Sequence, residues 1–117
     1  MRSSIVCVAL LLATAAPPRA FAHAFLDQAS PLVGSTVSTA PREVMLTFTQ
    51  SLEPAFSSVQ VFDAGGARVD IGKAQISGNT MRVGVKAAGP GTYHVRWRAL
   101  SVDTHATQGA FTFHVGQ

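Results

Sequence analysis

The sequence predicts an all-β protein, a Greek-key sandwich of two antiparallel sheets with about seven strands. Apolar and polar residues alternate with a period of two in several short segments, which is typical of strands with one buried and one solvated face. Turn-forming residues separate these segments, and no stretch after residue 22 has a sustained helical apolar period. The chain shows no internal repeat or linker that would divide it into further domains.

Residues 1–22 have the layout of a secretory signal peptide. Arg2 gives a short positive start, residues 5–16 are nearly all apolar, and Ala20-Phe21-Ala22 has the small-x-small pattern that signal peptidase cuts. The apolar run is shorter than the roughly 20 residues that span a membrane, which disfavours the alternative of an uncut anchor. We therefore expect cleavage after Ala22, with cleavage after Ala20 as the alternative, and a mature domain over residues 23–117.

The mature domain that this cleavage would leave is small and nearly neutral. Removing 22 of the 117 residues leaves 95, which is enough for one domain with a core of its own. The single cysteine, Cys7, leaves with the signal, which excludes a disulfide and a thiolate metal site in the mature chain. Arg2 and Arg19 leave as well, so the nine basic residues fall to seven, against six acidic ones. The basic residues are scattered, so we expect no nucleic-acid partner, and we expect a monomer.

Alternation locates five strands in the mature chain, and a further segment adds a first strand. In EVMLTFT, for example, Val44, Leu46 and Phe48 share one face. The six segments are AFLDQASP (24–31), which has the character of an edge strand, EVMLTFT (43–49), SSVQVF (57–62), TMRVGVK (80–86), TYHVRWR (92–98) and AFTFHV (110–115). The turn signals between them are Ser30-Pro31, Ala40-Pro41, Asp63–Gly66, Ser77–Asn79 and Gly89–Gly91. The inward faces predict a core of Leu46, Phe48, Val59, Val61, Val83, Val85, Tyr93, Val95, Trp97, Phe111 and Phe113.

The four histidines of the mature chain differ in context. His94 and His114 lie in mid-strand on the polar face, where we expect ordinary solvated side chains. His105 belongs to the connection SVDTHATQG between the last two strands, two residues after Asp103. In an extended backbone, positions two apart point the same way, so Asp103 and His105 could direct a carboxylate and an imidazole at one point. Alone, this D-x-H pattern is a weak signal, because loops often contain such pairs.

His23 gives the D-x-H pattern more weight. Cleavage after Ala22 would make His23 the first residue, so that its α-amine and imidazole Nδ1 could chelate one ion. An α-amine has a pKa of about 8, and a strongly binding metal can displace its proton near neutral pH. With His105 the site would have three nitrogens, and Asp103 could add an oxygen. Nitrogen-rich, thiolate-free, tetragonal coordination is the preference of Cu(II), whereas Zn(II), its chief competitor, prefers a tetrahedron. We predict one Cu(II) ion at His23, Asp103 and His105.

The chain also resembles a family, the CopC-like periplasmic copper-binding proteins, which are linked to bacterial copper resistance and homeostasis. The similarity covers residues 23–115 in three blocks, HAFLDQASPLVGSTV, PREVMLTFTQSLEPAFSSVQVFDAGG and AAGPGTYHVRWRALSVDTHATQGAFTFHV. The last block is the most specific, through Trp97, Asp103, His105 and Gly109. The resemblance implies an immunoglobulin-like or cupredoxin-like β-sandwich. It also implies a Cu(II) site made of the amine and imidazole of His23, together with Asp103 and His105.

Two features set this chain apart from some members of that family. Some members have a separate Cu(I) site in a methionine-rich loop, but the mature chain has only Met45 and Met81, in different strands. Because soft Cu(I) demands thioether ligands, we predict no Cu(I) site. Many members carry an acidic residue near the copper where this chain has Gln50, which can donate hydrogen bonds but cannot neutralise charge. The sequence leaves open whether Glu53 takes that role.

The predicted function is that of a periplasmic Cu(II) carrier or buffer in copper homeostasis and resistance, not that of an enzyme. The association of the family with CopD-type membrane proteins implies an inner-membrane partner. The alternative is a monooxygenase-like enzyme, because copper-dependent polysaccharide monooxygenases use a similar N-terminal histidine brace. Such an enzyme needs an open axial position and an aromatic face, whereas Asp103 would crowd the ion and most phenylalanines are expected in the core. A third alternative is an immunoglobulin-like adhesion or assembly module that binds no metal.

Overall fold

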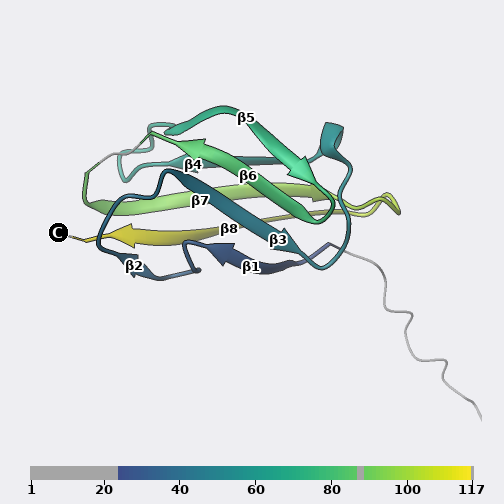
Figure 1. Ribbon diagram of the computed structural model, residues 1–117, viewed down its shortest axis with the longest axis horizontal. Coiled ribbons are helices and arrows are strands. Elements are labelled where there is room, and N and C mark those ends of the chain that lie inside the picture. The colour runs from purple at the N-terminus through teal and green to yellow at the C-terminus, as the bar shows by residue number, and fades with distance from the viewer. Residues whose placement is uncertain (1–23, 87–88, 117) are drawn as a thin grey trace, which may run out of the picture.

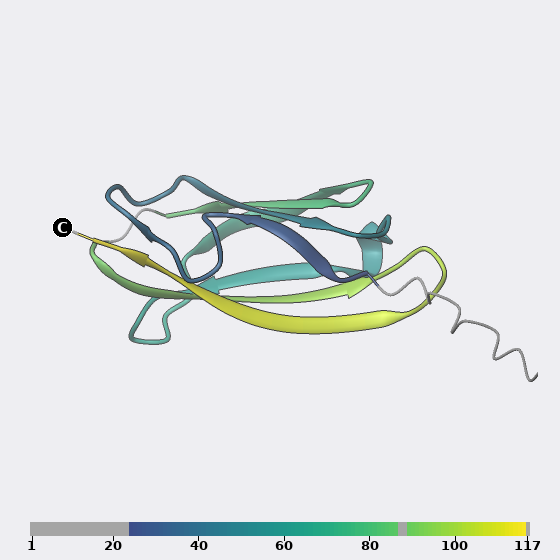
Figure 2. The same ribbon diagram turned by 90° about the horizontal axis from the view of Figure 1, so that it is seen from below.

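The computed structural model describes residues 24–86 and 89–116, which form a sandwich of two four-stranded sheets (Figure 1 and Figure 2). The predicted signal peptide and His23 lie outside the described residues. The strands are β1 Leu26–Ser30, β2 Thr36–Val37, β3 Glu43–Phe48, β4 Ser58–Phe62, β5 Asp70–Ser77, β6 Thr80–Val85, β7 Gly91–Leu100 and β8 Ala106–Val115, and a short 3-10 helix, η1, covers Pro54–Phe56. Within these two ranges, no helix has the length and hydropathy needed to cross a membrane.

The strand order confirms the predicted sandwich. One sheet has the order β1-β3-β6-β5 and the other the order β2-β8-β7-β4, so strands that are distant in sequence are neighbours in each sheet. The pairs are antiparallel, except that β2 and β8 run parallel over a short contact. The longest ladder joins β7 to β8, from Gly91 opposite Val115 to Leu100 opposite Ala106. This long hairpin carries the loop 101–105 to one end of the sandwich (Figure 1).

The predicted core lies between the two sheets. Every predicted core residue is buried except Trp97, which is half-buried and packs against the core. The Trp97 ring meets the Phe48 ring edge-on, with 5.0 Å between their centroids. Opposite Trp97 in the ladder stands Gly109, where a Cβ atom would lie only 2.6 Å from Trp97 Cζ2. The indole therefore needs a glycine beside it, which gives a packing reason for the Trp97–Gly109 pair.

The structure has eight strands where the sequence predicted about seven, and the segments located in the sequence include neither β2 nor β5. The pairing of β5 with β6 shifts between Ile71 and Gln75, and Gly72 in this stretch has a φ of +74°. This bulge breaks the period of two, and β5 is an edge strand with no fully buried position. β2 contains only Thr36 and Val37, which is too short to show a period.

Candidate metal centre

The predicted D-x-H pair lies in the loop that joins β7 to β8. Ser101 N donates a hydrogen bond to His105 O at 3.0 Å, and Thr104 N donates one to Ser101 O at 2.8 Å. Thr104, between the two candidate ligands, has a φ of 71°, a left-handed conformation that costs a β-branched residue conformational energy. The extended backbone assumed for Asp103 and His105 is therefore wrong, because the loop is a tight turn.

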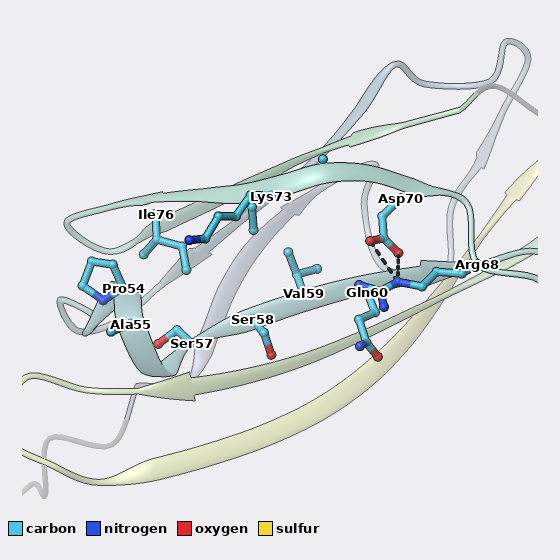
Figure 3. Close-up of a pocket in the computed structure, with 12 residues that line it drawn as sticks. Pro54, Ala55, Ser57, Ser58, Val59, Gln60, Arg68, Asp70, Lys73 and Ile76 are labelled. Carbon is cyan, nitrogen blue, oxygen red and sulfur yellow. Dashed lines mark hydrogen bonds and ion pairs between the residues drawn. The ribbon is translucent and has the colours of Figure 1, made fainter.

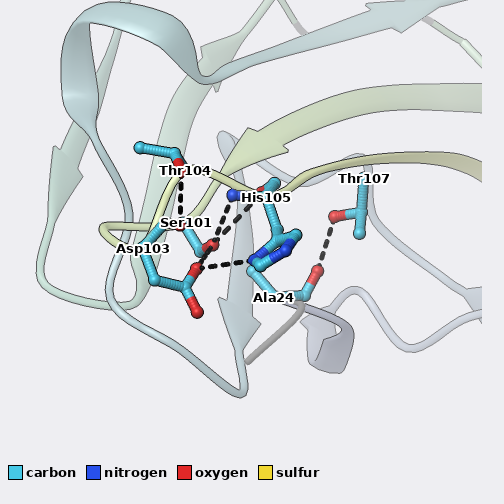
Figure 4. Close-up of polar contacts among 6 residues, drawn as sticks. All are labelled: Ala24, Ser101, Asp103, Thr104, His105 and Thr107. Atoms are coloured by element: carbon cyan, nitrogen blue, oxygen red, sulfur yellow. Dashed lines mark hydrogen bonds and ion pairs between the residues drawn. The ribbon is translucent and has the colours of Figure 1, made fainter. Parts of the chain in front are cut away.

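The turn nevertheless brings the two side chains together. His105 Nδ1 lies 3.3 Å from Asp103 Oδ1 (Figure 4). Both groups reach solvent, since 44% of the His105 side chain and 38% of the Asp103 side chain are exposed. The Nδ1 atom that faces Asp103 is itself buried, so an ion from solvent would meet the exposed part of the imidazole beside the carboxylate.

Ser101 is the buried centre of this turn, with 1% of its surface exposed. Its hydroxyl donates to Asp103 Oδ1 and accepts a hydrogen bond from His105 N at 3.2 Å. The bond from Ser101 is the main cause that holds the pKa of Asp103 below its ordinary value; partial burial opposes this shift, and His105 adds to it. Asp103 is thus an anion at neutral pH. Sequence reasoning missed Ser101. The available signal was a serine two residues before the D-x-H pattern.

The first described residues run beside the same loop. Thr107 Oγ1 donates a hydrogen bond to Ala24 O at 2.6 Å, and Ala24 is fully buried. Figure 4 shows Ala24 next to His105 and Thr107. Phe25 is fixed in turn, because its N–H donates to Thr49 Oγ1 at 3.0 Å and its carbonyl accepts from Thr49 N at 2.9 Å. Thr107 is a second contributor to this region that sequence reasoning missed, since only the fold brings it to Ala24.

The segment after β3 completes this end of the sandwich. Val102 N donates to Ser51 O at 3.1 Å, and Glu53 N donates to Leu100 O at 2.8 Å. Gln50, directly before Ser51, is half-buried at the same end. Both Gln50 and Glu53, the positions considered for an additional acidic group, therefore belong to the region around the D-x-H loop.

The other histidines lie away from this loop. His94 is exposed on β7, and His114 on β8 has its Nδ1 2.9 Å from Thr92 Oγ1. Across residues 24–86 and 89–116, no three His, Cys, Asp or Glu side chains gather into a metal site. Asp103 and His105 are thus a pair, and His23, the third predicted ligand, lies outside the described residues.

A groove of about 800 Å³ lies between β4 and β5 (Figure 3). Pro54 and Ile76 give it an apolar wall, and Lys73 adds a positive charge. Its one carboxylate, that of Asp70, already accepts hydrogen bonds from Arg68 Nε at 2.9 and 3.1 Å. The groove contains no histidine or cysteine, so the donor chemistry that suits copper is at the D-x-H loop and not here.

Comparisons with known proteins match nearly the whole chain. The CopC domain matches residues 26–116 of the chain, which include the D-x-H loop. The copper transport protein CutJ of Bacillus subtilis (strain 168) is 32% identical over 114 residues; the match covers 94% of this chain but only 21% of CutJ. The chain therefore spans about a fifth of the length of that relative. Copper resistance protein C of Xanthomonas campestris pv. juglandis is 33% identical over 131 residues, which cover 97% of this chain and 96% of that protein.

A solved structure has the same fold. The crystal structure of CopC from Methylosinus trichosporium OB3b matches with a TM-score of 0.74 and 32% sequence identity. The match covers 80% of this chain and 93% of that chain. The similarity thus extends over nearly the whole of that protein, in sequence as well as in fold.

Proposed function

The chain belongs to the CopC family, and from this premise we propose that it is a periplasmic Cu(II)-binding protein that carries and buffers copper in copper homeostasis and resistance. The full-length similarity to a copper resistance protein C supports a copper-binding role. In the proposal, residues 1–22 are removed on export, and one Cu(II) ion binds to His23, Asp103 and His105. An inner-membrane protein of the CopD type receives or supplies the ion.

The observation that carries this proposal is the hydrogen bond from Thr107 Oγ1 to Ala24 O, at 2.6 Å. Because Thr107 follows His105 by two residues, this hydrogen bond holds Ala24 beside the D-x-H loop. Consecutive Cα atoms are about 3.8 Å apart, so in the proposal a chain that begins at His23 would have its first residue within reach of this loop. The predicted ligands come from opposite ends of the sequence, and this contact supports their meeting.

The chemistry of the donors supports Cu(II) in particular. The amine and imidazole of a first histidine form one chelate ring, and the imidazole of His105 adds a third nitrogen. The ionised carboxylate of Asp103 favours the higher charge of Cu(II) over Cu(I). Met81 is fully buried in the core, whereas Met45 lies on the opposite face of the same sheet, so the two thioethers point apart. This arrangement supports the absence of a Cu(I) site built from these two methionines.

The test uses two forms of the protein, one starting at His23 and one with a single alanine added before it. The added residue turns the α-amine of His23 into an amide and moves the free amine one residue away, which breaks the chelate ring; we expect the fold to stay unchanged. We expect the form that starts at His23 to bind one Cu(II), with a type-2 electron paramagnetic resonance spectrum and a d–d absorption band. We expect the extended form to bind more than about 100-fold more weakly, a larger loss than the 10–100-fold typical of outer-shell changes.

Equal affinity of the two forms would contradict the chelate, and no specific Cu(II) binding by either form would contradict the proposed function. Mass spectrometry of the exported protein provides the matching check on the first residue. An exported chain that begins anywhere other than His23 would remove the basis of the predicted site.

One observation favours the second candidate function, a copper monooxygenase-like enzyme. Sequence reasoning expected most phenylalanines in the core, but 57% of Phe25 and 64% of Phe56 are exposed, and Phe25 directly follows Ala24, which contacts Thr107 near the candidate site. An exposed aromatic side chain near copper can support an extended sugar substrate. Ascorbate-driven peroxide formation and polysaccharide cleavage by the copper-loaded protein separate the two functions, and robust turnover would replace the carrier with the enzyme.

A further inference from the structure

We infer that Ser101 is a positioning residue for the copper site: its buried hydroxyl fixes the Asp103 carboxylate and the backbone of His105, and so sets which atoms face the ion. The inference rests on the proposed function, since it assigns a role within the same site. Ser101 itself contributes no ligand.

The position of Ser101 in the turn is what makes it a positioning residue. Only 1% of Ser101 is exposed, whereas Val102, Asp103 and Thr104 are exposed around it. Its hydroxyl donates to Asp103 Oδ1 and accepts from His105 N at 3.2 Å, so that one oxygen atom touches both candidate ligand residues (Figure 4). A group that bonds two ligand residues at once controls their separation as well as their directions.

The backbone of Ser101 fixes the hydroxyl in turn. Its N–H donates to His105 O at 3.0 Å, its carbonyl accepts from Thr104 N at 2.8 Å, and it forms a β-bridge with Leu52. The hydroxyl therefore starts from a fixed backbone, so that only the rotation of the Ser101 side chain has to be ordered for it to hold the carboxylate. This arrangement is expected of a residue that orients a metal ligand by a hydrogen bond without binding the metal itself.

The hydrogen bond also distinguishes the two oxygens of Asp103. Oδ1 is engaged by the Ser101 hydroxyl and lies 3.3 Å from His105 Nδ1. Oδ2 takes part in neither of these two contacts. Because Ser101 holds Oδ1, we expect the ion to bind Asp103 mainly through Oδ2.

The experiment compares four proteins that all start at His23: the wild type, Ser101→Ala, and the isosteric pair Ser101→Thr and Ser101→Val. Val102→Ala serves as the matched control, because the exposed Val102 side chain lies in the same loop. We expect Ser101→Ala to weaken Cu(II) binding by about 10–100-fold, measured by chelator competition, and to change the copper hyperfine splitting in the electron paramagnetic resonance spectrum. Val102→Ala should leave both unchanged.

The isosteric pair separates positioning from packing, since threonine keeps the hydroxyl and valine replaces it with a methyl group of similar shape. We expect Ser101→Thr to bind Cu(II) with nearly the wild-type spectrum and Ser101→Val to resemble Ser101→Ala. Unfolding curves identify variants that fold, so this pair decides the question even if Ser101→Ala does not fold. Wild-type affinity and spectrum in Ser101→Val would overturn the inference but leave the proposed function intact. Failure of the wild type to bind Cu(II) would overturn both.

Discussion

Two aspartates in this protein each stand two residues from a basic side chain, yet their surroundings differ. In the Arg68–Asp70 pair, only 3% of the Asp70 side chain is exposed, and Asp70 Oδ1 also accepts a hydrogen bond from Val61 N at 2.9 Å. In the Asp103–His105 pair, 38% of the Asp103 side chain is exposed, and its partner is an imidazole at 3.3 Å. The first carboxylate is closed off by a permanent cation, whereas the second remains open to an ion from solvent.

The difference teaches that a lowered pKa does not by itself mark a functional site. For Asp70, burial favours the neutral form, but hydrogen bonds from Arg68 and Val61 outweigh it and lower the pKa. For Asp103, a hydrogen bond from the neutral Ser101 is the main cause of the lowered pKa. Both groups are ionised at neutral pH, but only Asp103 keeps an anionic charge that no arginine or lysine offsets. Availability to an added cation, rather than the pKa, separates the site from the structural ion pair.

The largest effect that this comparison predicts is the loss of copper binding in His105→Ala. Removing one nitrogen donor should weaken Cu(II) binding by more than about 100-fold, or about 2.8 kcal/mol. Because 44% of the side chain is exposed, the free energy of unfolding without metal should change by less than about 0.5 kcal/mol. Chelator competition and urea unfolding measure the two quantities. The control is His94→Ala, which changes an exposed histidine on β7 and should keep the full Cu(II) affinity. An equal loss of Cu(II) affinity in His94→Ala would show that His105 is not a specific ligand.

The next largest effect is expected in Asp70→Ala, which should lose stability but keep its Cu(II) affinity. The change removes the charged hydrogen bonds to Arg68 and leaves Val61 N–H without its acceptor, so we expect the free energy of unfolding to fall by about 2 kcal/mol. Cu(II) affinity should stay within about threefold of wild type, because distant sites act independently. Urea unfolding and chelator competition apply again, with Asp27→Ala as the control at an exposed carboxylate on β1. A large loss of copper affinity would show that the two aspartates are coupled.

A smaller effect is the pH dependence of this stability. The folded pKa of Asp70 is lowered from its ordinary value, so its stabilising contribution is complete above the unfolded pKa of about 3.9 and is lost as the pH falls through the folded pKa. The wild type should therefore lose stability between pH 5 and pH 2 more steeply than Asp70→Ala, where this contribution is already gone. Urea unfolding of both proteins at several pH values in this range measures the slopes. Parallel curves would show that Asp70 does not titrate as described.

Most of the fold was predictable because one-sided burial leaves a period of two in the sequence. The core positions from Leu46 to Phe113 follow from that period, and all but the half-buried Trp97 are buried. β5 could not be found in this way, because the bulge at Gly72 resets the alternation and an edge strand buries little. The two exposed phenylalanines, Phe25 and Phe56, show the limit of composition, since an aromatic residue near a strand end need not face the core.

The candidate site was predictable only in its ligand chemistry. Asp103 and His105 came from a local pattern, and the structure brings them together through a turn rather than through the extended backbone that the pattern suggested. Ser101 acts through a buried hydroxyl, and Thr107 through a contact with Ala24 across most of the chain. The Thr107 contact depends on tertiary proximity, whereas the Ser101 contacts lie within one turn, and a period of two reveals neither. The meeting of His23 with this loop stays a prediction.

The smallest effect that sharpens the comparison concerns the residue between each pair. Val69, between Arg68 and Asp70, is buried, and its N–H donates to Val61 O at 2.8 Å, whereas Thr104, between Asp103 and His105, is exposed with a φ of 71°. Glycine adopts the left-handed conformation at no steric cost, but it also gains freedom in the unfolded chain, so Thr104→Gly should stabilise the protein by only about 0.5 kcal/mol.

The same substitution tests whether the open turn depends on its strained residue for copper binding. Thr104 Oγ1 donates only to the carbonyl of Asp103, at 2.5 Å, and touches neither candidate donor group, so Cu(II) affinity should change by less than about threefold. Urea unfolding and chelator competition measure both quantities, and Thr80→Gly in β6, where the backbone is extended, is the control and should destabilise. A gain in stability accompanied by a large loss of affinity would contradict this expectation. It would mean that the strained conformation of Thr104, and not only the hydrogen bonds of Ser101, holds the ligands in place.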